Sequence, residues 1–316
     1  MAAPAFGQVA DLPQGGEVAS GAASLNYSQP GALVVHQSTD SAIINWSSFD
    51  IGAANSVHFD QPGAESATLN RVLGDTPSVL AGALSAPGMV MLVNPNGVSL
   101  TESGVVDTGS FVASTLDIAD SDFLSGRTTF RRNGRAGVVS NRGAIRVGEG
   151  GSVALIGAGV INEGVVEARL GAVAFGAGDL VTLDFAGDGF LSIGIPVSDL
   201  EGLTDASGRP LSALITADGA VRADGGRIFL SAAGAQSLMR QAINVPGELI
   251  ARSVGRDAQG RIVLEAHGGA AVLSGRLDAS GGAHDGGDVV INGGAVVQGG
   301  VINADGAAGG SVQIAA

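Results

Sequence analysis

The chain has 316 residues, of which 52 are glycine, only 4% are aromatic and none is cysteine. Its hydrophobic content of 45% excludes disorder for lack of core-forming residues, and its apolar runs are too short to span a membrane. The net charge of −14, with arginine as the only basic residue type, argues against nucleic-acid binding. High glycine with few aromatics is typical of β-solenoids and unusual in compact α/β enzymes.

We expect residues 1–23 to form a flexible N-terminal segment that becomes ordered near Val18. Met1–Ala5 lacks the basic start and apolar run of a signal peptide, and it fits the remainder left by cleavage at an Ala-x-Ala site, with Met1 added. Acidic residues alone occupy the charged positions before the first cation, Arg71: Asp11, Glu17, Asp40, Asp50, Asp60 and Glu65. We interpret them as a solvated acidic surface, with long-range attraction to a basic partner as the alternative.

Short alternating strands separated by turns follow over residues 24–63. The exposed end of a solenoid would be an adhesive edge, so a stacked coil needs a cap, and we assign this stretch to it. Trp46 and Phe49 are isolated large aromatics here, and we expect them to fill the core beneath the cap.

The stretch Met89–Ile118 is the most informative part of the sequence. An apolar run long enough for one buried strand ends in Asn94-Pro95-Asn96-Gly97, and these residue types suit the four positions of a β-turn. The Asn94 side chain can fold back onto the backbone of its own turn. Further short strands follow with no room for a crossover helix, which indicates a chain that winds through several sheets in succession.

Four ordered blocks carry a resemblance to a known family: Ile43–Phe59, Ser66–Gly74, Asn94–Gly97 and Gly109–Ile118. They resemble the secretion domain of the filamentous-haemagglutinin family in two-partner secretion, in its high-molecular-weight adhesin branch. The family's second motif, Asn-Pro-Asn-Leu, is absent. The resemblance implies a secretion domain over 24–176 and a role in export for Asn94, Pro95, Asn96 and Gly97.

The same resemblance implies a secreted or cell-surface protein of Gram-negative type, exported through periplasm and outer membrane. Its partner would be an outer-membrane barrel transporter with periplasmic receptor domains. A host or cell-surface ligand would be bound mainly by sequence beyond this chain. The lack of cysteine suits a chain threaded unfolded through a pore, although the fold could equally do without disulfides.

Residues 120–137 interrupt the strand pattern, and we interpret them as a hairpin that leaves the solenoid. Four arginines lie close together within it: Arg127, Arg131, Arg132 and Arg135. They are possible contacts for an anionic partner, although loop charges are more often simply solvated.

A glycine-cornered repeat follows, with one short strand, a glycine-rich corner and a second strand in each copy. Copies begin at Gly143, Gly164, Gly219, Gly247, Gly275 and Gly300. This spacing predicts one turn of a right-handed parallel β-helix per copy, so that residues 177–316 continue the β-helix. An insertion at about 180–217 accounts for the one long interval. Within this insertion, we interpret residues 184–199 as an extra-helical hairpin. Further along the chain, residues 232–243 carry the single helical pattern of the sequence. The last strand lacks a polar cap, so we expect more coils to follow.

The search for chemistry favours a protein without catalytic residues, cofactor or metal. Carboxylate pairs occur at Asp184 with Asp188 and at Asp285 with Asp288, but both lie beside glycines, where turns favour Asp. The histidines, His36, His58, His267 and His284, lack metal-site spacing. The alternatives to a secretion domain are a polysaccharide-active parallel β-helix enzyme and a stand-alone structural solenoid.

Overall fold

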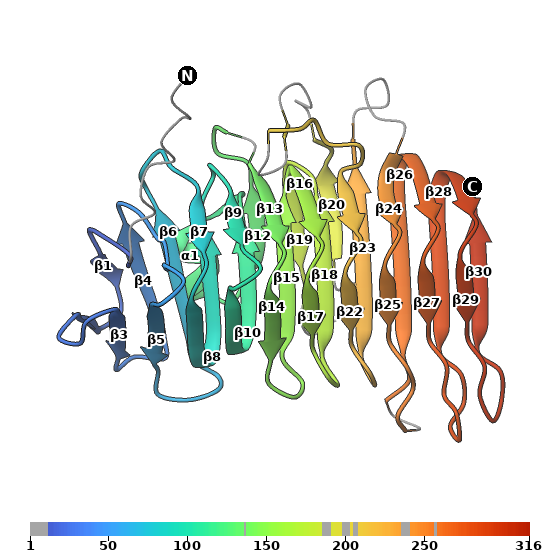
Figure 1. The fold of residues 1–316 in the computed structure, drawn as a ribbon, viewed down its shortest axis with the longest axis horizontal. Helices are drawn as coiled ribbons and strands as arrows, with labels where there is room; N and C mark the ends of the chain where they lie inside the picture. Colours follow the sequence, from blue (N-terminus) through green and yellow to red (C-terminus); the bar gives the residue numbers. More distant parts are fainter. Residues whose placement is uncertain are drawn as a thin grey trace.

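A computed structural model describes residues 12–135, 137–184, 191–197, 203–204, 208–234, 241–255 and 258–316. The chain forms a parallel β-helix whose coils stack in sequence order along the long axis, from the N-terminal end to the C-terminal end (Figure 1). Each coil contributes strands to three parallel ladders, which we name the first, second and third faces. Among the described residues, no helix is long and apolar enough to cross a membrane.

The first face stacks ten segments in parallel register: β3 (Ala32–Gln37), β5 (Ser56–Asp60), the first halves of β8 (Ala83–Val93) and β10 (Val105–Ser114), β14 (Ala144–Val147), β17 (Val165–Glu167), β22 (Ala220–Arg222), β25 (Glu248–Ile250), β27 (Arg276–Asp278) and β29 (Val301–Asn303). Its inward row is an apolar ladder made by Val57, Leu84, Val106, Ile145, Val166, Val221, Leu249 and Leu277, each at most 1% exposed. Because one coil cannot bury such a row alone, each coil depends on its neighbours.

The second face continues each coil after a corner: β4 (Ser41–Trp46), β6 (Ala67–Val72), the second halves of β8 and β10, β15 (Ser152–Gly157), β18 (Ala172–Ala177), β23 (Arg227–Ala233), the first halves of β26 (Arg261–Leu273) and β28 (Asp288–Gln298), and β30 (Ser311–Ala315). The third face closes the coil: β7 (Ser78–Leu80), β9 (Val98–Leu100), β13 (Val138–Asn141), β16 (Gly159–Asn162), β21 (Ile215–Ala217), β24 (Gln241–Val245) and the second halves of β26 and β28. The six glycine-cornered copies each supply one first-face and one second-face strand, as the sequence predicts.

The N-terminal cap is shorter than the sequence indicated. It consists of β1 (Glu17–Ser20) and β2 (Ala23–Asn26), which pair antiparallel with β4 and β3. The assignment of all of 24–63 to the cap is wrong, because β3 and β4 already stack in parallel on β5 and β6. Alternation in short strands is the same in a cap and in a coil, so the sequence could not separate them. Strand β1 begins at Glu17, beside Val18, where the sequence predicts that order begins.

A second, four-stranded antiparallel sheet lies outside the coil. It joins β11 (Asp117–Ile118), β12 (Thr128–Arg131), β19 (Leu180–Leu183) and β20 (Leu191–Ile195), with the short helix α1 (Asp120–Leu124) between β11 and β12. The two extra-helical hairpins expected from sequence therefore form one sheet, which we call the covering sheet. Its large side chains, including Phe130 and Leu183, share a buried cluster with the small outward residues Ala154 and Ala174 of the second face.

The helical pattern expected over residues 232–243 is wrong at both of its ends. Ala232 belongs to β23 and Ile243 to β24, while residues 235–240 lie outside the described residues. Ile243 pairs in register with Ile215 below it, and Ala232 with Ala177. Ladder pairing with the neighbouring coils therefore overrides the local helical spacing.

Candidate functional site

The turn Asn94–Gly97 connects β8 to β9 at the corner between the second and third faces. Asn94 is completely buried, and its Oδ1 accepts hydrogen bonds from the Asn96 backbone N–H and from Asn96 Nδ2, both at 3.0 Å. The Gly97 N–H donates to the Asn94 carbonyl at 3.0 Å, and Gly97 has φ of 131°, a region that side-chain-bearing residues rarely adopt. The predicted fold-back of Asn94 onto its own turn is present.

The same two asparagines also bind the preceding coil. Asn94 Nδ2 donates to the Thr76 carbonyl and to Ser78 Oγ, each at 3.0 Å, while Asn96 Nδ2 donates to the Gly74 carbonyl at 2.8 Å. In the other direction, the Asn94 backbone N–H donates to the carbonyl of Ser114 in the next coil at 2.9 Å. The turn therefore connects three consecutive coils, which the sequence alone did not reveal.

The segment that follows β12 packs directly onto the turn. Arg135 Nη1 donates to Asn96 Oδ1 at 3.1 Å. Gly137 lies so close that an added Cβ would come within 2.7 Å of both the Pro95 carbonyl oxygen and the Gly97 nitrogen. A glycine is therefore required at 137. Its close approach lets the segment between β12 and β13 pack against the turn.

The four arginines within residues 120–137 do not form one binding patch. Arg127 forms an exposed ion pair with Asp122 at 2.7 Å, and Arg132 lies 3.5 Å from the carboxylate of Asp179 and donates to the Gly134 carbonyl. Arg135 binds the turn as described above. Within the described part of the chain, the exposed Arg131 guanidinium forms no ion pair. Three of the four side chains therefore have partners within the protein itself.

Sequence reasoning missed the role of Arg71, which it noted only as the first cation. Arg71 lies on β6, its side chain is 13% exposed, and it reaches the covering sheet through Asp117 at 2.9 Å and Asp120 at 2.8 Å. It also donates to the Ile118 carbonyl at 2.7 Å. Burial acts to lower the pKa of Arg71, but the two carboxylates raise it by more, so the guanidinium is firmly charged.

The motif blocks, the turn and the stacked coils can now be compared with known proteins. A family model for the TPS secretion domain matches residues 10–314. The chain belongs to the TPS secretion domain family. The match continues well past residue 176, so the family pattern extends further than the four motif blocks indicated, and a boundary at 176 stays a prediction.

Among solved structures, this TPS domain is similar to the HMW1 secretion domain from Haemophilus influenzae. The TM-score is 0.81 at 32% identity, covering 96% of this chain and 76% of that one. Two sequences named heme/hemopexin-binding protein, also from Haemophilus influenzae, are similar as well. One is 36% identical over 171 residues, covering 52% of this chain and 19% of that protein. The other is 34% identical over 114 residues, covering 36% and 12% respectively.

The TPS domain thus spans about a fifth or less of the length of these curated relatives. The family comprises the secretion domains of two-partner secretion exoproteins, which are secreted or surface proteins of Gram-negative bacteria. It is a non-enzymatic family, so the alternative of a polysaccharide-active enzyme is set aside.

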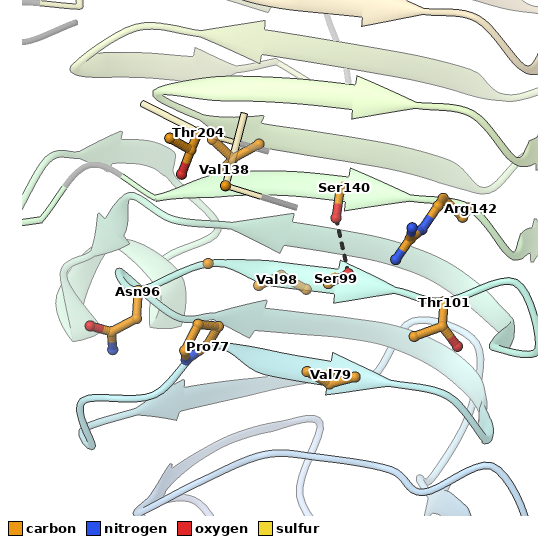
Figure 2. Close-up of a pocket in the computed structure, with 12 residues that line it drawn as sticks. Pro77, Val79, Asn96, Val98, Ser99, Thr101, Val138, Ser140, Arg142 and Thr204 are labelled. Carbon is orange, nitrogen blue, oxygen red and sulfur yellow. Dashed lines mark hydrogen bonds between the residues drawn. The ribbon is translucent and has the colours of Figure 1, made fainter. Parts of the chain in front are cut away.

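Two surface hollows of the TPS domain meet at the turn. One is a groove of about 530 Å³ over β7, β9 and β13, and the other is a hollow of about 310 Å³ beside Leu73, Pro95 and Arg135. Asn96 lines both of them, and Figure 2 shows it at one end of the larger groove. The half-buried Pro95 and Asn96 and the groove side of Gly97 are thus the parts of the turn that a partner can reach, whereas Asn94 is fully buried.

The other candidate residues have structural roles or lie outside the description. Asp285 accepts a hydrogen bond from the Ala308 N–H at 3.1 Å, and Asp288 accepts one from the Ser311 hydroxyl at 2.8 Å, so both hold a neighbouring coil. Asp188 lies outside the described residues, so its pairing with Asp184 is not seen. His36 contacts Asp60, and His58 contacts Ser85. No group of three potential metal ligands occurs among the described residues.

Proposed function

We propose that this TPS domain is the secretion signal of a large exported adhesin-like protein. In this proposal, the periplasmic receptor domains of an outer-membrane barrel transporter capture it, and its first coils then template coil-by-coil folding outside the cell. The observation that carries the proposal is the position of Asn94. It is fully buried, and its side chain joins its own turn to the preceding coil.

Burial of Asn94 supports a role in folding rather than one as a surface epitope. A partner that meets the folded domain can reach Pro95, Asn96 and the groove side of Gly97, but not Asn94, which is fully buried. The hydrogen bonds that Asn94 Nδ2 donates to Thr76 and Ser78 can form only when two coils are stacked. In a solenoid each coil contacts only its neighbours, so growth proceeds outward from a stacked pair. Asn94 joins the second coil to the third, near the N-terminal end, so the turn is placed to act early if growth begins there.

Capture by the transporter would use the exposed charges of the early coils. Glu17, Asp40, Asp60 and Glu65 are exposed, which suits attraction to a basic receptor surface. Arg131 is the member of the arginine group that is available to an anionic partner, since the other three bind within the domain. Affinity for the isolated periplasmic domains should fall as the salt concentration rises.

Co-expression with the cognate transporter tests this function. The chain carrying a cleavable signal peptide should appear outside the cell only when the transporter is present with its periplasmic domains intact. A transporter that lacks those domains but still assembles in the membrane is the matched control. Export that does not depend on the transporter would favour the stand-alone solenoid and contradict the proposal.

A further inference from the structure

The groove over the third face has a composition that the secretion role does not explain. It is lined by the outward side chains of β7, β9 and β13 and by the segments that flank them, with Thr204 at its margin (Figure 2). Val79, Ser99 and Ser140 occupy equivalent positions on three consecutive coils. The groove therefore runs across the coils, and its floor combines apolar and hydroxyl-bearing side chains.

The floor of the groove excludes recognition by strand addition. Strand β9 is hydrogen-bonded to β7 on one side and to β13 on the other. Its backbone donors and acceptors are thus already used within the ladder, and an extended peptide has no free edge to join. A ligand must instead be recognised by side chains.

Those side chains specify an anionic ligand that carries hydroxyl groups. Arg142 is the one charged residue among the described residues that line the groove. It is exposed, its guanidinium has no ion-pair partner in the described part of the chain, and Figure 2 shows it beside the strand that bears Ser99. The chain has 30 acidic and 16 basic residues, and at least eight of its described arginines form ion pairs, so an arginine without one is the less common case.

The groove offers both polar and apolar groups to a ligand. Ser99 and Thr101 offer hydroxyl groups to the groove. Ser140 is 8% exposed and donates to Ser99 Oγ at 3.0 Å, which leaves the Ser99 hydroxyl able to donate to a ligand. Val79 and Val138 offer apolar surface against which the C–H faces of a pyranose ring can pack. The volume of about 530 Å³ is in the range of small-ligand sites.

We propose that this groove binds a short acidic oligosaccharide, with a ligand carboxylate on Arg142 and ligand hydroxyls on Ser99 and Thr101. The site is for binding only, because its described lining contains no carboxylate that could act as a general acid or base. An acidic peptide could satisfy Arg142 and bond to the hydroxyls through its backbone, but it has no pyranose C–H face to pack on Val79 and Val138, so it is the weaker fit.

Calorimetric titration of the purified chain with trigalacturonic acid tests the proposal. The wild-type chain should bind this probe more tightly than its methyl ester, which lacks the charges, and more tightly than triglutamate, which lacks the hydroxyls. Arg142→Gln should weaken binding by about tenfold, the value of one charge-assisted pair of about 1.4 kcal/mol. Arg169→Gln is the matched control, because Arg169 is 67% exposed, forms only a 3.5 Å pair with Glu149 and lies outside the groove.

A second variant keeps the proposal testable if Arg142→Gln fails to fold. Ser99→Leu adds bulk to the groove floor without a change in charge, and it should also abolish binding while circular dichroism remains that of the parent. The proposal is overturned if the wild-type chain does not bind trigalacturonic acid at millimolar concentration. It is also overturned if Arg142→Gln binds as the parent does, or if triglutamate binds equally well.

Discussion

Replacement of Arg71 by Gln should release the covering sheet from the coil while the coil itself stays folded. The Arg71 guanidinium connects β6 to Asp117 and Asp120, which flank the start of the covering sheet, and to the backbone carbonyl of Ile118. Glutamine is neutral and too short to replace these three contacts. Asp117, with its side chain 25% exposed, would lose its cation and keep its charge.

The size of the effect follows from the burial of each partner. Removal of one member of a fully buried ion pair costs about 3–5 kcal/mol, whereas an exposed pair contributes about 0–1 kcal/mol. The Arg71 side chain is 13% exposed and Asp120 is 54% exposed, so the Asp117 pair carries most of the energy. We therefore expect a loss of roughly 2–3 kcal/mol, confined to the covering sheet.

Hydrogen exchange measured by mass spectrometry can locate this loss. Amides of β11, β12 and β19 should exchange faster in Arg71→Gln, while those of β14, β17 and β22 should exchange as in the parent. Arg127→Gln is the control, because Arg127 is 63% exposed in its pair with Asp122 and its loss should change little. Unchanged protection of β12 and β19, or equal loss of protection over all coils, would refute the assignment of Arg71 as the anchor.

Two further predictions concern single positions near the turn. Asp50→Asn should be more stable than the parent at pH 7, because burial raises the pKa of Asp50 and thus disfavours its charged form in the folded state, while asparagine keeps the acceptor for the Val79 N–H. In denaturation measured against pH, this advantage should shrink as the pH falls through the folded-state pKa of Asp50. It should vanish at lower pH, where Asp50 is protonated in both the folded and the unfolded state. Gly137→Ala should cost more than about 2 kcal/mol in urea unfolding, because its Cβ would collide with Pro95 and Gly97. Gly148→Ala, where the nearest atoms lie 3.8 Å away, should be tolerated, and equal stability of the two variants would contradict this reasoning.

The coil could be predicted from sequence because its determinants are local and repeated. Each copy has a glycine corner and an alternating strand, and stacking in register places rows such as Val166, Val221 and Leu249 on top of one another. The internal bond of the Asn94 turn was also predictable, since Asn96 lies only two residues away. Such features need only the order of residues and the strand period of two.

The contacts between distant segments could not be predicted in the same way. Arg132 and Arg135 look like members of a cationic patch, yet their partners Asp179 and Asn96 lie 47 and 39 residues away in sequence. The covering sheet likewise depends on the pairing of β12 with β19, which are separated in sequence by intervening coils. No local pattern encodes such pairings, because they arise only once the number of coils between the segments is fixed.

We propose that Asn94 acts on the folding of the early coils, and refolding kinetics test this role. Asn94→Ala leaves the Thr76 carbonyl and the Ser78 hydroxyl without their buried donor, at a cost of roughly 2–3 kcal/mol. Asn162→Ala is the matched variant. Asn162 is equally buried, lies in a later coil than Asn94, and accepts a hydrogen bond from Asn141 in the coil before its own. In stopped-flow denaturant jumps, Asn94→Ala should refold about tenfold or more slowly, whereas Asn162→Ala should mainly unfold faster. Refolding of Asn94→Ala at the parent rate, together with lost binding to the transporter's periplasmic domains, would contradict the account and identify the turn as a recognition epitope.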